Sequence, residues 1–194
     1  MAARIPKGYA VPLGFRNRHY SEFVSWDELH TLNGKNIDAI IHLAGKAHDT
    51  RNTAAAQEYF DINLRLTQKI YEFFLQSGAK KFIFFSSVKA AADTVPGEYL
   101  TENTEPTPGT AYGRSKLEAE RFLTSFGMTA PKKNYILRPC MIHGPGNKGN
   151  LNLLYKAVSK GIPWPLGAFE NRRSFTSIAN LNFIVGQLLE KDIE

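Results

Sequence analysis

The sequence lacks most of the features that mark secreted, membrane-embedded or nucleic-acid-binding proteins. Its single cysteine, Cys140, excludes an internal disulfide and favours a reducing, cytoplasmic compartment. No apolar run reaches the roughly 18 residues of a membrane span, and the N-terminus has no long apolar core of a secretion signal. The net charge is +6, but the Lys and Arg residues are scattered. We therefore expect neither nucleic acid nor membrane as a partner, while a modest positive field suits an anionic small molecule.

Patterns of metal-binding residues are also missing. His42 and His48 invite a metal interpretation, but they lack cysteine or carboxylate partners at ligand spacing. We expect His42 to be a satisfied residue of the core, and we expect no metal to be bound.

Apolar runs alternate with segments of helical periodicity over most of the chain. The pattern predicts strands at residues 9–15, 37–43, 81–86 and 134–139. It predicts a short helix that starts with a capping box of Ser25 and Glu28, and longer helices at residues 53–77, 110–126, 151–159 and 178–189. Such alternation is typical of βαβ units, so we expect an α/β fold with a parallel sheet and helices on both faces.

Small or polar residues follow three of the predicted strands. These exits are Ala44-Gly45, Ser86-Ser87 and Arg138-Pro139. In open parallel sheets, ligands bind beyond the carboxyl ends of the strands. The three exits are therefore expected to line one ligand-binding crevice.

Tyr112 and Lys116 are one helical turn apart near the start of a predicted helix, so they share a face. A nearby ammonium favours the phenolate, and we expect Lys116 to lower the pKa of Tyr112 toward the range of a general acid/base. Ser87 supplies a second hydroxyl that can hold a substrate oxygen. The alternatives are an exposed Tyr-Lys pair without a task and serines that only cap a strand end.

Further motifs accompany this pair: His42-Leu43-Ala44-Gly45, Phe85-Ser86-Ser87, Leu137-Arg138-Pro139 and Gly144-Pro145-Gly146. Together they resemble the extended short-chain dehydrogenases/reductases, and within them the NAD-dependent nucleotide-sugar epimerase/dehydratase family with its UDP-glucose 4-epimerase-like members. The resemblance extends from about Tyr9 to the end of the chain. It implies a Rossmann-like, doubly wound parallel sheet. We expect a single domain over residues 1–194, in which residues from about 140 to 194 contribute to the substrate lobe.

The resemblance also implies roles for individual residues. Tyr112 would be the general acid/base on the sugar 4-hydroxyl, and Ser87 would form a hydrogen bond to the reacting oxygen. Lys116 would lower the pKa of Tyr112 and hold the nicotinamide ribose. The residues expected to contact NAD or NADP are Arg16, Ala44, Gly45, Lys46, Asn63, Ser86, Tyr112, Lys116 and Pro139. Those expected to contact the UDP-sugar are Ser87, Lys89, Asn150, Leu151 and Arg173, the last as a charge-assisted partner of the diphosphate.

The chain departs from the family pattern at its start. Members open with a strand, a Gly-x-x-Gly-x-x-Gly loop that binds the cofactor pyrophosphate, and a helix. This sequence contains no such loop. We expect the first strand-helix unit to be missing and the substrate lobe to be truncated.

Two functions follow as expectations. The first is NAD(P)-dependent epimerisation or reduction at C4 of a UDP-sugar. The alternative is a non-catalytic fragment or remnant that binds a nucleotide sugar or a partner chain without turnover. Family members often pair through helices that correspond to residues 53–77 and 110–126, so a homodimer is a further expectation.

Overall fold

The structure is a computed structural model that describes residues 24–47, 56–95, 97–127, 131–144, 150–162 and 172–193. The expected strand at 9–15 and the predicted cofactor contact Arg16 lie outside these residues. In chain order the helices and strands are η1 (Trp26–Leu32), β1 (Ala39–His42), α1 (Ala56–Phe60), η2 (Asp61–Arg65), α2 (Leu66–Gln76), β2 (Lys81–Phe85), η3 (Val88–Ala90), α3 (Ala111–Ser125), β3 (Lys133–Leu137), β4 (Met141–His143), α4 (Asn150–Ser159), β5 (Phe175–Ser177) and α5 (Ile178–Glu190).

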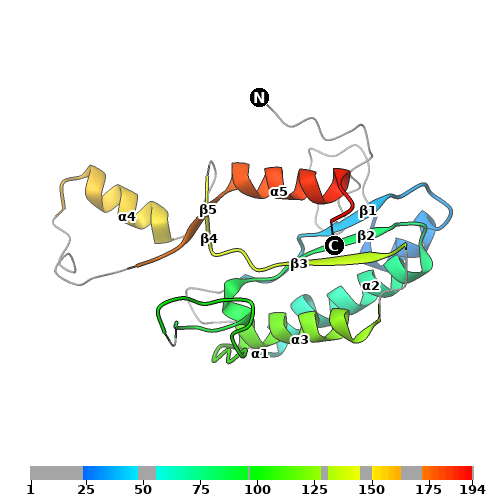
Figure 1. The fold of residues 1–194 in the computed structure, drawn as a ribbon, viewed down its shortest axis with the longest axis horizontal. Coiled ribbons are helices and arrows are strands. Elements are labelled where there is room, and N and C mark those ends of the chain that lie inside the picture. Colours follow the sequence, from blue (N-terminus) through cyan, green and yellow to red (C-terminus); the bar gives the residue numbers. More distant parts are fainter. Residues whose placement is uncertain are drawn as a thin grey trace. The chain divides into compact units, whose positions relative to one another are not determined.

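The chain divides after Arg138 into two compact units. The first unit holds a three-stranded sheet of order β1-β2-β3, and both strand pairs are parallel. Ile83 in the central strand stands opposite Ile41 on one side and Tyr135 on the other. Helices α2 and α3 run along the same face of this sheet (Figure 1). The predicted α/β class with a parallel sheet is therefore confirmed.

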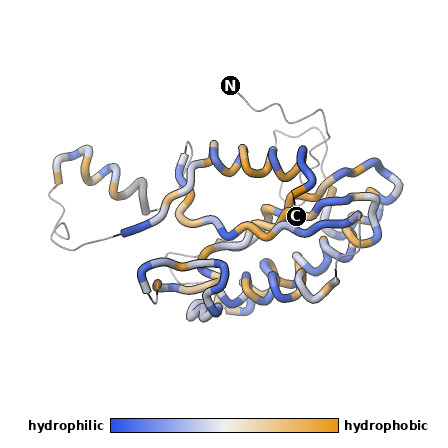
Figure 2. The backbone as a smooth tube through the Cα atoms, in the orientation of Figure 1, coloured by the Kyte–Doolittle hydropathy of each residue, from blue (hydrophilic) through white to orange (hydrophobic). Residues whose placement is uncertain are grey.

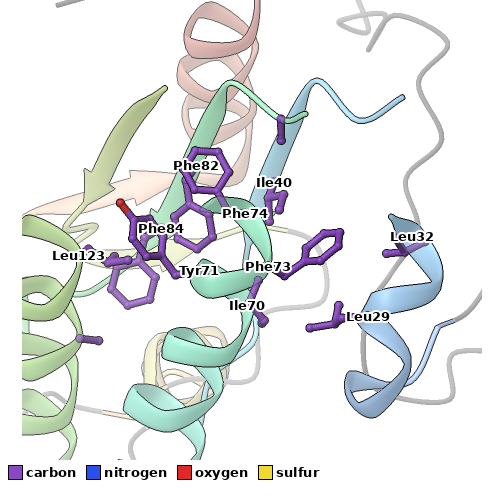
Figure 3. Close-up of a cluster of buried hydrophobic side chains, with 12 residues drawn as sticks. Leu29, Leu32, Ile40, Ile70, Tyr71, Phe73, Phe74, Phe82, Phe84 and Leu123 are labelled. Atoms are coloured by element: carbon purple, nitrogen blue, oxygen red, sulfur yellow. The ribbon is translucent and has the colours of Figure 1, made fainter. Parts of the chain in front are cut away.

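The central strand β2 is apolar on both faces, and this explains its place in the sheet. Phe82, Ile83 and Phe84 are all fully buried. Figure 3 shows Phe82 and Phe84 among side chains of α2 and α3, including Tyr71 and Phe74. The ring centroids of Tyr71 and Phe82 are 5.0 Å apart, and those of Phe74 and Phe82 are 5.3 Å apart. Full burial of each such side chain stabilises the fold by about 2–3 kcal/mol.

The helix predicted over residues 53–77 is present from Ala56 to Gln76, but it is not uniform. A π-helical turn, η2, separates α1 from α2. Its one buried residue is Asn63. Sequence periodicity did not reveal this turn, because one widened turn changes the register of the apolar stripe only slightly.

Lys132 fixes the C-terminal end of α2. Its ammonium donates to the carbonyl oxygens of Phe74 at 2.8 Å, Ser77 at 2.9 Å and Ala79 at 2.8 Å. These carbonyls lie in the last turn of α2 and just beyond its end, where a cation is favourable. The helix thus ends one residue before Ser77, close to the stop predicted at Gly78.

The segment after Ser25 is a 3₁₀ helix, η1, with non-helical backbone angles at Glu28. The Ser25 hydroxyl accepts from the backbone N–H of Asp27, not from that of Glu28 as the predicted capping box requires. The short helix was predicted correctly, and its capping box was wrong.

The second unit contains a parallel pair of short strands, β4 and β5, and the helices α4 and α5. The two strands were not predicted, because three residues are too few for a periodic signal. Helix α5 begins where the Ser177 hydroxyl accepts from the backbone N–H of Asn180 at 3.0 Å. Figure 2 shows hydrophobic residues along α5, and among them Phe183 keeps 64% of its surface exposed. None of the helices in the described part of the chain is long and apolar enough to cross a membrane.

Candidate active site

The first two hydroxyls of the site meet at the carboxyl end of β2. Ser87 caps η3, and its hydroxyl accepts from the backbone N–H of Lys89 at 3.2 Å. The Thr110 hydroxyl caps α3 by accepting from the Gly113 N–H at 3.1 Å, and this places Tyr112 in the first helical turn. The Ser87 hydroxyl lies close enough to the Tyr112 phenol to lower its pKa. The structure thus brings together the serine and tyrosine that the sequence predicted as catalytic partners.

Gly113 allows α3 to approach η3 this closely. A Cβ atom added at Gly113 would lie 2.4 Å from the Lys89 carbonyl oxygen and 2.9 Å from Cβ of Pro108. The first of these neighbours is backbone and cannot move aside without shifting η3. A glycine is therefore required here, because the first turn of α3 packs directly against the backbone of η3.

Asp93 ties the loop between η3 and α3 to both of its ends. Its Oδ2 accepts from the backbone N–H groups of Gly109 at 2.6 Å and Thr110 at 3.2 Å, and its Oδ1 pairs with Lys89 Nζ at 3.1 Å. Burial acts to raise the pKa of Asp93, but these hydrogen bonds and the Lys89 charge together lower it. The predicted substrate contact Lys89 thus holds an intramolecular carboxylate in this structure, and its substrate role stays a prediction.

Lys116 is buried beneath the strand exits, with 4% of its surface exposed. Its Nζ donates to the carbonyl oxygen of Phe85 at 2.8 Å and lies 4.7 Å from the ring centroid of Phe84. Burial lowers the pKa of Lys116 to about 8, and the negative charge of Glu120 opposes that shift. At pH 7 most Lys116 amines therefore still carry a proton.

The pKa of Tyr112 moves in the direction opposite to the sequence-based expectation. Burial raises it, and the nearby Ser87 hydroxyl offsets only part of the rise. The physical reason is that the Lys116 ammonium donates to the Phe85 carbonyl, while Tyr112 has lost much of its solvent. Tyr112 is a neutral phenol in this structure.

A neutral hydrogen-bonded group, which we call the amide cluster, is centred on Asn63 and joins the exit of β1 to α3. Asn63 Oδ1 accepts from the Lys46 N–H at 2.8 Å, and its Nδ2 donates to the Lys46 carbonyl at 3.1 Å and the Ser115 hydroxyl at 3.0 Å. Ser115 in turn donates to the Tyr112 carbonyl at 2.8 Å. The π-helical turn η2 presents Asn63 to these partners, and a lost partner would leave a buried polar group unsatisfied.

The amide cluster extends to His42 through Thr67. The Thr67 hydroxyl donates its only proton to the Asn63 carbonyl at 2.7 Å, so His42 Nε2, 2.8 Å away, must be the donor to Thr67 Oγ1. Burial, reinforced by the charge of Lys116, lowers the pKa of His42 to about 3. His42 is a neutral, satisfied core residue, as its sequence context predicted.

A charged group, the carboxylate cluster, lies on the other side of Lys116 and is formed by Glu120, Ser86 and Arg138. Arg138 Nη2 donates to Glu120 Oε2 at 2.5 Å and Nε donates to Oε1 at 3.0 Å, while the Ser86 hydroxyl donates to Oε1 as well. Glu120 keeps only 5% of its surface exposed. Sequence analysis missed Glu120, although its place one helical turn after Lys116 was a readable signal.

The remaining predicted contacts belong to the second unit or lie outside the described residues. Pro139 lies two residues before β4, Arg173 lies exposed before β5, and Asn150 and Leu151 begin the first turn of α4. The side chains of Asn150 and Leu151 are outside the described part of the structure, as is Arg16. For all of these residues, a ligand-binding role stays a prediction.

The geometry of the first unit agrees with a family match. Residues 6–192 match the model of the NAD-dependent epimerase/dehydratase family. This chain belongs to that family. The resemblance predicted from its strand-exit motifs is therefore confirmed.

Two curated relatives are 4-epimerases. The chain is 36% identical over 151 residues to UDP-glucose 4-epimerase of Vibrio cholerae, a match covering 76% of this chain and 46% of the relative. It is 30% identical over 147 residues to N-acetyl-alpha-D-glucosaminyl-diphospho-ditrans,octacis-undecaprenol 4-epimerase of Escherichia coli O157:H7, covering 75% and 43% of the two chains. The chain thus spans less than half the length of these relatives.

Solved structures share the fold at lower identity. UDP-N-acetylglucosamine 4-epimerase from Methanobrevibacter ruminantium M1 superposes with a TM-score of 0.74 at 21% identity, covering 93% of this chain and 62% of that chain. UDP-glucuronic acid 4-epimerase from Bacillus cereus, solved with UDP-glucuronic acid and NAD, gives a TM-score of 0.69 at 24% identity, covering 85% and 52%. The Rossmann-like fold is confirmed by these neighbours.

Proposed function

We propose that this chain carries the Ser-Tyr-Lys site of an NAD(P)-dependent enzyme that epimerises or reduces a UDP-sugar at C4. The observation that carries the proposal is the meeting of three groups at one edge of the sheet. Ser87 lies near the Tyr112 phenol and lowers its pKa, and Lys116 is buried one turn further along α3. The 4-epimerase relatives, one of them named for UDP-glucose, support the substrate class.

The residues at the exit of β1 fit a nicotinamide dinucleotide. A Cβ atom at Gly45 would lie 3.0 Å from Lys116 Nζ and 3.1 Å from Asn63 Oδ1, so the bare backbone lies directly against the polar groups. A side chain at position 45 would crowd both groups, so glycine suits the point where the exit of β1 packs against Lys116 and Asn63. The residues of the first unit that would hold the dinucleotide are Ala44, Gly45, Lys46, Asn63, Ser86, Tyr112 and Lys116. The chemistry that this cofactor supplies when bound is the acceptance and return of a hydride.

The protein's own task is then to move one proton at the sugar O4. The Tyr112 hydroxyl, neutral in this structure, can donate its proton to O4 when a 4-keto sugar is reduced. In the reverse direction its phenolate accepts the proton of the 4-hydroxyl. Ser87 holds the same oxygen by a hydrogen bond, and the Lys116 ammonium stabilises the phenolate as it forms.

The proposed function is tested by cofactor binding and by one conservative substitution. We expect NADH fluorescence to change on titration with the protein, and we expect turnover of UDP-glucose or UDP-N-acetylglucosamine. Tyr112→Phe removes the proton donor, so turnover should fall by about 10²–10⁴-fold while NADH still binds. The matched control is Tyr99→Phe, which makes the same change at a tyrosine with 73% of its surface exposed and should leave turnover unchanged.

Two outcomes would overturn an enzymatic role for this chain. One is the absence of NADH binding at millimolar cofactor, and the other is a Tyr112→Phe protein with full turnover. If a UDP-sugar binds in calorimetry while NADH does not, the alternative of a non-catalytic nucleotide-sugar binder is supported instead.

A further inference from the structure

The buried carboxylate of Glu120 has no part in the proton transfer proposed above, yet it lies close to the groups that do. Glu120 is one turn beyond Lys116 on the same face of α3 and keeps 5% of its surface exposed. A buried carboxylate is costly unless it is paired and hydrogen-bonded. A buried carboxylate beside a proposed active site therefore calls for a specific role.

Lys116 and Glu120 contact consecutive residues at the end of β2. Lys116 Nζ donates to the carbonyl of Phe85 at 2.8 Å, and the hydroxyl of Ser86 donates to Glu120. The two charged side chains thus bind neighbouring residues at the same strand end, one through a backbone carbonyl and one through a hydroxyl. Ser86 is also tied to β3, because its backbone N–H donates to the Leu137 carbonyl at 2.8 Å.

Arg138 completes the arrangement from the end of β3. Its guanidinium donates to both carboxylate oxygens of Glu120, at 2.5 Å from Nη2 to Oε2 and 3.0 Å from Nε to Oε1. This is a two-point contact that fixes the carboxylate in orientation as well as position. The side chain of Arg138 keeps 28% of its surface exposed, against 6% for Glu120, so the carboxylate is the deeper member of the pair.

We propose that Glu120 is a positioning residue for Lys116: paired with Arg138, it holds the end of β2 against α3 and supplies the negative charge that stabilises the Lys116 ammonium. This inference rests on the proposed function, because it assigns Glu120 a task within the same site. Glu120 acts through Lys116 and is not placed against substrate or cofactor.

The other titratable groups around Lys116 do not offer this charge. His42 on β1 is neutral above pH 3, since burial lowers its pKa to about 3. Tyr112, on α3 itself, is neutral because burial raises its pKa. Arg138 is a cation, and the remaining polar contact is the uncharged carbonyl of Phe85. Glu120 is the carboxylate that opposes the effect of burial on Lys116.

Protonation of Lys116 depends on this balance near neutral pH. With a pKa of about 8, roughly nine in ten Lys116 amines are protonated at pH 7. Loss of an opposite charge one helical turn away on the same face should lower this value by about one unit or more. Without Glu120, about half of the Lys116 side chains or fewer would be in the ammonium form that Tyr112 needs at pH 7.

The test is a direct titration of Lys116 in the full chain by nuclear magnetic resonance. Protein labelled with [ε-¹³C]lysine gives one Hε–Cε signal per lysine, and the Lys116→Arg variant identifies the signal of Lys116 by its loss. We expect a midpoint near 8 in the wild-type protein. Glu120→Gln should lower the midpoint by about one unit or more, and Glu120→Asp, which keeps the charge, should restore most of it.

A matched control removes the same charge from the outer face of the same helix. Glu118 pairs with Arg121 at 2.8 Å, and their side chains keep 44% and 57% of their surface exposed. Glu118→Gln should leave the Lys116 midpoint unchanged, because solvent screens an exposed charge. An equal shift in the Glu118→Gln and Glu120→Gln proteins would overturn a specific role for Glu120.

Arg138→Met provides an independent test in the opposite direction. It removes the cation that neutralises Glu120, so the Lys116 midpoint should rise above the wild-type value. This variant keeps the test decisive even if Glu120→Gln fails to fold. A folded Glu120→Gln protein with the wild-type midpoint, or a folded Arg138→Met protein whose midpoint does not rise, would overturn the proposal. The titration requires neither cofactor nor substrate, so a failure to bind NADH would count against the proposed function alone.

Discussion

The amide cluster and the carboxylate cluster both hold α3 against the strand exits, but they differ in charge. Asn63 joins the exit of β1 to α3 through neutral hydrogen bonds of 2.8–3.1 Å. Glu120 joins α3 to the ends of β2 and β3 through an ion pair. Both central side chains are almost fully buried. A neutral cluster can fix position without affecting neighbouring charges, whereas a buried ion pair also sets the electrostatic environment of Lys116.

The difference in charge suits the two clusters to different parts of the site. The amide cluster ties the helix to the segment expected to lie along the dinucleotide, where an uncompensated negative charge would repel phosphates. The carboxylate cluster ties it to the peptide unit beneath Lys116, where a negative charge stabilises the ammonium. Each cluster can be broken separately by substitution. The expected losses in the free energy of unfolding differ in size and in pH dependence.

The largest effect is expected when the ion pair is broken from one side. Arg138→Met leaves the Glu120 carboxylate, 6% exposed, without its cation. The free energy of unfolding should fall by about 3 kcal/mol, measured by urea denaturation followed by circular dichroism. The double variant Glu120→Leu/Arg138→Met removes both charges and should recover most of the loss. If the single and double variants lose the same free energy of unfolding, the pair stabilises the fold through packing and not through charge compensation.

A somewhat smaller effect is expected from the neutral cluster. Asn63→Leu preserves much of the side-chain volume but removes the partners of the Lys46 backbone and the Ser115 hydroxyl. We expect the same denaturation experiment to show a loss of about 2–3 kcal/mol. Asn103→Leu, at an exposed position, is the control and should change stability by less than about 0.5 kcal/mol. If Asn63→Leu and Asn103→Leu lower the free energy of unfolding equally, the hydrogen bonds of Asn63 do not stabilise this region.

The smallest expected effect tests the pH dependence of the amide cluster through His42. Between pH 6.5 and about 3 the unfolded chain binds a proton on His42 that the folded protein does not. The free energy of unfolding therefore falls as pH falls, by about 1.4 kcal/mol per pH unit, or about 2 kcal/mol between pH 7 and pH 5.

His42→Gln should flatten this dependence, since glutamine does not titrate. His30→Gln, at an exposed position, should retain the wild-type slope. Urea denaturation at a series of pH values between 5 and 7 measures both. A wild-type protein whose stability is constant over this range would contradict the neutral buried state of His42.

The secondary structure of the first unit was largely predictable, because long apolar runs determine it. The run Phe82-Ile83-Phe84 has no alternating pattern, so a strand buried on both faces was its simplest explanation, and all three residues are fully buried. The stripe containing Ile70, Phe73 and Phe74 predicted the helix packed against that strand. Strands β4 and β5 were missed because pairing with each other, not a local pattern, defines elements this short.

The site was predictable in its parts and not in its electrostatics. The spacing of Tyr112 and Lys116 placed them on one helix face, and the small residues at the strand exits placed Ser87 and Gly45 at the same sheet edge. The predicted direction of the Tyr112 pKa shift was wrong, because the shift depends on how much solvent the folded chain removes from the phenol. Glu120 was missed because a charged residue on a helix is usually solvated, and only its neighbours show that this one is not.

The sequence by itself determined the α/β class, the family and the three groups suited to proton transfer. The α/β class follows from periodicity and the Tyr112–Lys116 pair from spacing, both of which are local in the chain, while the family was indicated by the resemblance of the strand-exit motifs. The tertiary structure decided that Asn63 faces Lys46 and Ser115, that Glu120 meets Arg138, and that Lys116 donates to Phe85. Such contacts join residues far apart in sequence, and burial then sets their charge states, because the cost of removing water depends on everything packed around the group.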